Sequence, residues 1–69
     1  MSEIAIVLNG EPRRVAVGIT IAALVTDIGL NPAKVAVERN LDIVPRSTLA
    51  DVLLAEGDTL EIVHFVGGG

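Results

Sequence analysis

The one run of consecutive glycines in the chain stands at its C-terminus, in the tail Val66-Gly67-Gly68-Gly69. Glycine is entropically costly to order, so this tail is predicted to be mobile and extended in the free protein. Four residues at about 3.3–3.6 Å each reach roughly 13 Å, and Gly67 and Gly68 could thread a narrow channel in a partner. An α-carboxylate is ionised at neutral pH. The carboxylate of Gly69 is therefore a competent nucleophile toward the α-phosphate of ATP, and the resulting acyl-adenylate would be open to attack by a sulfur donor, giving a thiocarboxylate.

A glycine-rich end can also be a frayed terminus or a remnant of expression, since termini are commonly disordered. Two features argue against that interpretation here. No tag or linker sequence accompanies the glycines, and the apolar residues up to Val66 run into them without a polar spacer. The tail therefore remains the main candidate for chemistry.

The other residue types that could do chemistry do not form a recognisable set. The sequence has no cysteine, which excludes disulfides, thiolate catalysis and Cys-ligated metals. His64 is the single histidine and cannot form a triad or a metal site alone. Asp58 and Glu61 are interpreted as a solvated turn residue and a solvated strand residue. We predict no catalytic residue, no metal and no bound cofactor, with ATP used by the activating partner, so the chain is expected to be a carrier and not an enzyme.

Length and composition restrict the class of protein. The chain has 69 residues, which indicates one domain, and 51% of them are hydrophobic, with Phe65 as the one aromatic residue. The net charge is −4, and the basic residues are scattered, so nucleic-acid binding is disfavoured. The longest uncharged stretch, between Arg14 and Asp27, is shorter than the roughly 18 residues that a membrane-spanning helix needs. The N-terminus lacks the basic region of a signal peptide. We expect a cytoplasmic protein without membrane contact.

The first half of the chain predicts a hairpin and one helix. Residues 3–9 and 13–17 alternate as strands around Asn9-Gly10, a pair that accepts positive φ. Thr20 is a predicted helix cap, and Gly29 marks the end of the helix. The helix is expected to run for two to three turns with an apolar stripe formed by Ile21, Leu24, Val25 and Ile28.

The second half predicts three further segments. Residues 34–39 are expected to be extended and to turn at 40–42 into a short strand at 43–44. Residues 47–54 are expected to hold a single helical turn with three inward side chains: Leu49, Val52 and Leu53. Residues 59–66 form the last predicted strand. The order ββαββ predicts an α+β fold, a mixed sheet of about five strands packed on one helix in the β-grasp, or ubiquitin-like, arrangement. The predicted domain is 1–66, followed by the tail 67–69.

The last strand also suggests a docking surface. If Leu60 and Ile62 face the helix, Val63, Phe65 and Val66 form an exposed apolar patch that leads into the tail. Such patches often mark contacts between proteins. Ordinary exposure on a sheet surface is the alternative interpretation. Scattered arginines could border this patch or simply be solvated: Arg13, Arg14, Arg39 and Arg46.

Taken together, these segments resemble the ThiS family, the ubiquitin-like sulfur carriers of thiamine biosynthesis. The resemblance spans essentially the whole chain and is carried by Asn9-Gly10-Glu11, Val35-Ala36-Val37-Glu38-Arg39-Asn40, Ile43-Val44-Pro45-Arg46, Glu56-Gly57-Asp58, Glu61-Ile62-Val63 and Val66-Gly67-Gly68-Gly69. No single segment is diagnostic of the family, but the order of the segments together with the chain length is. The sequence departs from the family pattern where Leu41-Asp42 replaces a small polar turn and where Thr48-Leu49 replaces an aromatic or acidic residue.

The resemblance implies that an E1-like adenylyltransferase of the ThiF type adenylates Gly69. It implies that sulfur drawn ultimately from cysteine then forms the thiocarboxylate, and that thiazole synthase of the ThiG type receives the sulfur for the thiazole ring of thiamine. The family's diglycine corresponds to Gly68 and Gly69, with Gly67 as an additional residue. Two alternatives remain open: the small subunit of a molybdopterin-synthase-like sulfur-transfer system, and a ubiquitin-like protein modifier.

Overall fold

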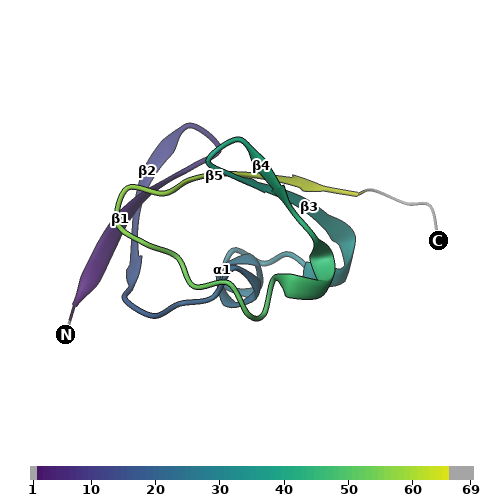
Figure 1. Cartoon of the computed structure of the whole chain (residues 1–69), viewed down its shortest axis with the longest axis horizontal. Coiled ribbons are helices and arrows are strands. Elements are labelled where there is room, and N and C mark those ends of the chain that lie inside the picture. The colour runs from purple at the N-terminus through teal and green to yellow at the C-terminus, as the bar shows by residue number, and fades with distance from the viewer. Residues whose placement is uncertain (1, 66–69) are drawn as a thin grey trace.

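A five-stranded mixed sheet curves around one short helix in the computed structural model, which describes residues 2–65 (Figure 1). The strand order is β2-β1-β5-β3-β4. The elements are β1 (Glu3–Leu8), β2 (Glu11–Ala16), α1 (Ile21–Asp27), η1 (Pro32–Lys34), β3 (Val35–Arg39), β4 (Asp42–Val44), η2 (Arg46–Thr48) and β5 (Thr59–His64), where η marks a 3-10 turn. The predicted α+β, β-grasp arrangement is confirmed.

The first hairpin forms where the sequence predicts it. Asn9 and Gly10 form a two-residue turn with φ angles of 50° and 84°, and Leu8 pairs with Glu11 across it. Both angles are positive, as a type I′ turn requires, and this turn matches the natural twist of the strands. Pro12 has no N–H to donate. It lies in β2, an edge strand, so no hydrogen bond between central strands is lost.

Helix α1 has well-formed ends. The Thr20 hydroxyl accepts a hydrogen bond from the Ala23 N–H at 3.1 Å, so the predicted cap is confirmed. At the other end Gly29 has φ 89°. Its N–H donates to the Thr26 carbonyl and the Leu30 N–H donates to the Val25 carbonyl, both at 3.0 Å, which is the Schellman pattern. The helix therefore stops after seven residues.

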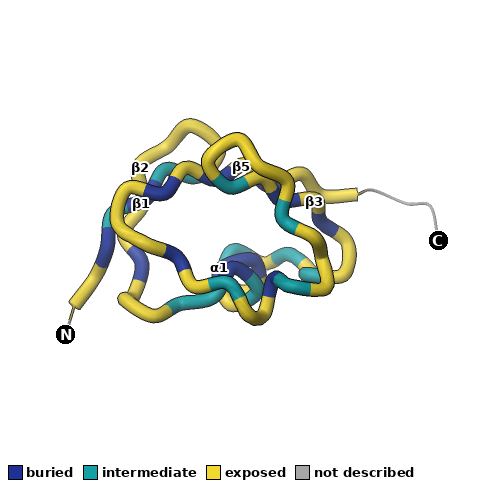
Figure 2. The backbone as a smooth tube through the Cα atoms, viewed as in Figure 1, coloured by how far each residue is buried: buried dark blue, intermediate teal, exposed yellow. Residues whose placement is uncertain are grey.

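The core lies between the concave face of the sheet and α1 (Figure 2). Three of the four residues of the predicted helical stripe are buried, and Ile28 is partly exposed because it is the C-cap residue. The buried hydrophobic residues are Ile4, Ile6, Val15, Ile21, Leu24, Val25, Val35, Val37, Leu49, Leu54, Leu60 and Ile62. The period-two predictions for β3 and β5 are thereby confirmed.

The segment after β4 differs from its prediction. The 3-10 turn η2 continues into a hydrogen-bonded turn at residues 49–51, and the chain is extended only over residues 52–54, where its side chains alternate. Leu49 is buried and Val52 is partly buried, but Leu53 is 57% exposed, and Leu54 is buried in its place. The cause is backbone pairing, because the Leu54 N–H donates to the Ile19 carbonyl at 3.0 Å and Leu53 forms a bridge with Thr20. The predicted inward position of Leu53 was wrong.

Strand β5 occupies the centre of the sheet. It pairs in parallel with β1 and antiparallel with β3, and it ends at His64 rather than at the predicted residue 66. The Phe65 N–H still donates to the Lys34 carbonyl at 2.8 Å, so the pairing with this side of the sheet continues one residue further. Within residues 2–65, no helix is long and apolar enough to cross a membrane.

Candidate functional site

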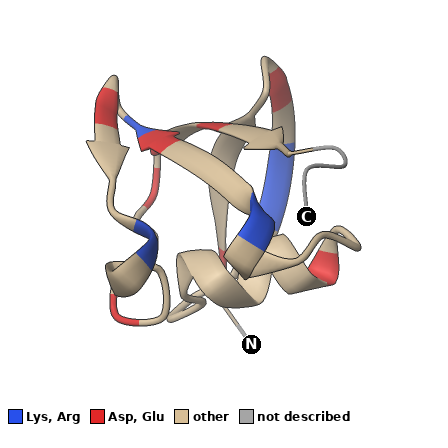
Figure 3. Cartoon of the chain, turned by 90° about the vertical axis from the view of Figure 1, so that its right-hand side faces the viewer, with Lys and Arg blue, Asp and Glu red and all other residues tan. Residues whose placement is uncertain are grey.

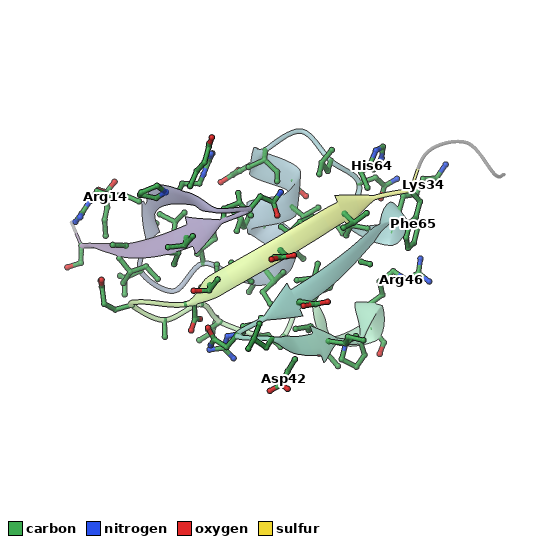
Figure 4. All side chains as sticks on the ribbon, turned by 90° about the horizontal axis from the view of Figure 1, so that it is seen from above. Arg14, Lys34, Asp42, Arg46, His64 and Phe65 are labelled. Carbon is green, nitrogen blue, oxygen red and sulfur yellow. The ribbon has the colours of Figure 1, made fainter. Side chains whose placement is uncertain are left out.

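The last described residues lie at a small surface that we call the tail root, formed by Lys34, Arg46, His64 and Phe65 (Figure 4) together with Val63, which precedes His64 in β5. Val63 is 60% exposed and Phe65 is 44% exposed, as expected from their alternation with Leu60 and Ile62. The predicted contact residue Val66, the predicted threading residues Gly67 and Gly68, and the predicted reactive residue Gly69 lie outside the described residues.

One arginine fixes the tail root. The Arg46 guanidinium lies 5.4 Å from the centre of the Phe65 ring, and its Nη1 donates to the Ala33 carbonyl at 3.0 Å. A cation–π contact at an exposed site is worth about 0.5–1 kcal/mol. Arg46 thus ties η1 and η2 to the end of the sheet. Of the four arginines that could border the apolar patch, Arg46 is the one that contacts it, through Phe65.

The other arginines lie elsewhere. Arg14 is at the far end of the sheet in Figure 4, where it contacts Glu3 at 3.2 Å with both side chains exposed. Such exposed pairs contribute little to stability. Lys34 and Arg46 instead give the tail root a positive character in a chain of net charge −4. Figure 3 shows the contrast, because acidic residues stand at the tips of both hairpins.

Strand β5 is pinned beside β1 by a side chain. The ladder between these strands has only two paired positions, Val7 with Thr59 and Leu8 with Leu60. The Asn9 amide then continues it, since Oδ1 accepts from the Ile62 N–H at 2.8 Å and Nδ2 donates to the Ile62 carbonyl at 3.3 Å. Asn9 therefore helps set the course of β5 toward the tail root.

Asp58 anchors the start of β5, and its predicted solvated role was wrong. Its exposed fraction is 6%. Oδ2 accepts from Arg39 Nε at 2.9 Å and from the Ala55 N–H at 2.8 Å, while Oδ1 accepts from Asn40 Nδ2 at 3.0 Å. Glu61, by contrast, is exposed as predicted. Sequence alternation missed Asp58 because two of its three partners, Arg39 and Asn40, come from the β3–β4 hairpin.

The environment of Asp58 changes its pKa. Burial by itself would raise the pKa, but the bonds from the Ala55 N–H, Asn40 and Arg39, together with the Arg39 charge, outweigh it and hold the pKa of Asp58 below its ordinary value. A carboxyl whose pKa is lowered by folding stabilises the folded state above its unfolded pKa, and this contribution disappears as the pH falls through the folded pKa.

We therefore expect the melting temperature of the wild-type chain to decrease when the pH is lowered below about 4, which is the region of an ordinary Asp pKa. Asp58→Asn carries no titrating group at this position, so its melting temperature should depend less steeply on pH there. Thermal melts of both proteins between about pH 7 and pH 2.5 measure the difference. Parallel curves throughout that range would contradict the assignment.

A shallow groove of about 420 Å³ adjoins the tail root. It is lined by Ala22, Pro32, Ala33, Arg46, Ser47, Leu49 and Ala50. Its lining offers a single charged side chain, so the groove supplies no acid–base pair. Within residues 2–65, no three metal-ligating side chains are grouped together. The described domain thus presents an exposed apolar and basic surface beside a shallow groove at this end of the sheet.

Comparison with known proteins agrees with this arrangement. A model described as the ThiS family matches residues 6–69, nearly the whole chain. The chain belongs to the ThiS family. The sulfur carrier protein ThiS of Bacillus subtilis is 44% identical over 50 residues, which cover 72% of this chain and 76% of that protein. A crystal structure of the thiamine biosynthesis protein ThiS from Geobacter metallireducens has a TM-score of 0.79 at 26% identity, covering 96% of this chain and 100% of that one.

A different kind of relative also matches. A thiazole synthase of Paramagnetospirillum magneticum is 52% identical over 64 residues, which are 93% of this chain but 20% of that protein. The chain thus spans about a fifth of the length of this relative. In that protein, a segment similar to this chain is therefore part of a longer polypeptide named thiazole synthase.

Proposed function

We propose that this chain is a sulfur carrier of thiamine biosynthesis, and that Gly69 holds the sulfur as a C-terminal thiocarboxylate. The observation that carries the proposal is the family match, which runs from residue 6 through residue 69 and so includes all three tail glycines. The name of the Bacillus subtilis relative, sulfur carrier protein ThiS, supports it. The described domain supports it as well, because it leads β5 to an exposed surface at the start of the tail.

The proposed chemistry has two steps. A Gly69 carboxylate oxygen attacks the α-phosphorus of ATP, the bond to the β-phosphate breaks, and pyrophosphate leaves. A sulfur nucleophile at the oxidation level of sulfide then attacks the acyl carbon, AMP leaves, and the thiocarboxylate remains. Adenylation is useful because AMP is a far better leaving group than oxide. Gly67 and Gly68 would deliver the reacting carbon into a narrow site, since they carry no side chains.

Three partners follow from this proposal. An E1-like adenylyltransferase of the ThiF type would bind ATP and catalyse the first step, and a cysteine-derived donor would provide the sulfur. A thiazole synthase of the ThiG type would accept it, which the similarity to the Paramagnetospirillum magneticum protein supports. The chain would be consumed and regenerated as a cosubstrate, so the catalytic groups belong to the partners.

Intact mass tests the proposal. The chain is incubated with ATP, a ThiF-type adenylyltransferase and a sulfur source, and its mass should rise by the difference between one sulfur atom and one oxygen atom. Thiazole synthase should then return the mass to its starting value as sulfur is transferred, whereas molybdopterin synthase should not. An unchanged mass in the presence of a competent adenylyltransferase would refute the proposal.

The apolar part of the tail root should contribute to docking. Phe65→Ala removes an aromatic ring that is 44% exposed and its contact with Arg46, and we expect about a tenfold loss of affinity for the adenylyltransferase. Val17→Ala is the matched control, because Val17 is 60% exposed but follows β2, an edge strand that does not neighbour β5. Binding measured by calorimetry should separate the two variants. Equal losses would show that the tail root has no special part in docking.

A further inference from the structure

Two hairpins of this domain have the same turn geometry but different residues. Asn9-Gly10 and Asn40-Leu41 are both two-residue turns, closed by the pairs Leu8–Glu11 and Arg39–Asp42. The φ angles are 50° and 84° in the first turn and 52° and 74° in the second. Type I′ turns favour Asn-Gly because the second position also needs positive φ. The second hairpin places Leu41 where the first has glycine.

Leu41 is unfavourable in this position for two independent reasons. Its φ of 74° brings Cβ close to the following carbonyl oxygen, a strain that glycine avoids. Its side chain is also 88% exposed, so it gains nothing from burial in the domain. A residue that breaks two local rules without a gain in the isolated fold is the type of position where function is expected.

The surrounding structure holds Leu41 in this conformation. The Asn40 N–H donates to the Thr59 carbonyl at 2.7 Å, and Asn40 Oδ1 accepts from the Thr59 N–H at 2.9 Å. Asn40 Nδ2 also donates to Asp58 at 3.0 Å. These bonds tie the turn to the start of β5. Leu41 is therefore presented on a rigid support, which lowers the entropy lost on binding.

The chemistry around Leu41 indicates what it contacts. Ile43, two residues on, is 79% exposed, and it pairs across the sheet with Glu38, which pairs in turn with Glu61. Asp42, Glu38 and Glu61 are exposed, whereas the nearby Arg39 is engaged by Asp58. The β3–β4 tip, formed by Leu41, Asp42 and Ile43, is thus an apolar projection among free carboxylates. Its complement is an apolar pocket bordered by basic side chains.

The β3–β4 tip and the tail root occupy different parts of one sheet. In Figure 4, Asp42 lies well apart from Phe65 and Arg46. The first region is acidic and apolar, and the second carries Lys34 and Arg46 beside Phe65. A partner that contacts both regions receives the domain in one orientation, because reversing it would oppose like charges.

We propose that Leu41 and Ile43 anchor this chain in an apolar, basic-rimmed pocket of the thiazole synthase that receives the tail. The inference rests on the proposed function. Thiazole synthase is the partner chosen because a relative 52% identical to this chain is itself named a thiazole synthase. The β3–β4 tip then fixes the orientation in which β5 directs the tail.

The test uses the full chain, purified thiazole synthase of the ThiG type, and three variants. Leu41→Gly gives the second hairpin the Asn-Gly pair of the first, and Leu41→Met keeps an apolar side chain on the same backbone. Leu53→Asn is the control, because Leu53 is 57% exposed but pairs with Thr20 beside α1 instead of lying in the sheet. Affinities are measured by calorimetry, with melting temperatures in parallel.

Leu41→Gly should melt no lower than the wild type, because it relieves the strain, yet bind thiazole synthase about tenfold more weakly. Leu41→Met and Leu53→Asn should bind within about twofold of the wild type. Loss of stability together with affinity in Leu41→Gly, or an equal loss in Leu53→Asn, would overturn the inference. The inference would also be overturned if Leu41→Gly bound thiazole synthase as well as the wild type does. The same holds if Leu41→Gly lost affinity only for the adenylyltransferase.

The outcome also separates this inference from the function on which it rests. Wild-type chain that forms a thiocarboxylate and binds thiazole synthase, with Leu41→Gly binding equally well, would overturn the anchor alone. Wild-type chain that neither gains sulfur nor binds thiazole synthase would overturn both. Asp42→Lys adds a test of charge and should weaken binding most at low salt, since screening reduces its effect.

Discussion

Deletion of Gly69 should abolish thiocarboxylate formation without changing the folding transition. The shortened chain would end at Gly68, so its carboxylate would stand about 3.3–3.6 Å short of the reacting position. A displacement of even 1 Å can reduce a rate by about 100-fold when it spoils an attacking geometry. We therefore expect a loss of at least that size in the rate of sulfur gain, followed by intact mass.

The folding part of this expectation comes from the position of the core. Every buried hydrophobic residue of the described domain lies between Ile4 and Ile62, and the last described backbone bond of β5 to its neighbour is made by Phe65. Melting temperatures of the wild-type chain and the deletion variant should therefore agree. Gly69→Ala is the matched control, since it keeps the length and adds only one methyl group. It should retain more activity than the deletion unless the channel is too narrow for a side chain, and undiminished sulfur gain by the deletion variant would refute the role of Gly69.

Local chemistry in the sequence was enough to predict most of the fold. Asn9-Gly10 specified the first hairpin because few residue pairs accept two positive φ angles. Thr20 and Gly29 specified the ends of α1 because a hydroxyl and a residue without Cβ satisfy the unpaired groups there. In each case a few neighbouring residues carry the whole physical cause.

The predictions failed where the cause was distant in sequence. A short apolar run such as Val52-Leu53-Leu54 fits either a helical turn or an extended segment. The segment is extended because its backbone pairs with Ile19 and Thr20, which lie more than 30 residues earlier in the chain. The contact between Arg46 and Phe65 is of the same kind, because no local pattern brings these residues together.

Leu41 had a local signal of a different kind. Asn40-Leu41-Asp42 was recognised as a turn, but its type was not, since leucine does not predict positive φ. Only the register of Arg39 with Asp42 shows that the turn has two residues. A residue type that is unfavourable at the φ angle of its turn becomes evidence for a function once that angle is known. The role of the tail glycines therefore stays a prediction, since they lie outside the described residues. The exposure of Val63 and Phe65 could be predicted from alternation, whereas the β3–β4 tip required the fold.

Asp58→Ala should lower the stability of the domain by about 2 kcal/mol, because it removes the acceptor shared by a partly buried network of hydrogen bonds. The substitution leaves Arg39, Asn40 and the Ala55 N–H without their shared acceptor. For a domain of this size, each kcal/mol shifts the melting temperature by roughly 4–8 °C. Asp58→Asn keeps the shape and one oxygen acceptor, so its loss should be smaller.

The control for this effect is Asp51→Ala, which removes an exposed carboxylate from the same chain. It should change the stability by less than about 0.5 kcal/mol, as surface substitutions usually do. A double-mutant cycle with Arg39→Ala should show coupling between residues 39 and 58, because the two form one network. Urea unfolding measures the stability of the wild-type chain, each single variant and the double variant. If Asp58→Ala and Asp51→Ala were equally stable, β5 would not depend on the Asp58 carboxylate. The β3–β4 hairpin would then be held to β5 mainly by the hydrogen bonds between Asn40 and Thr59.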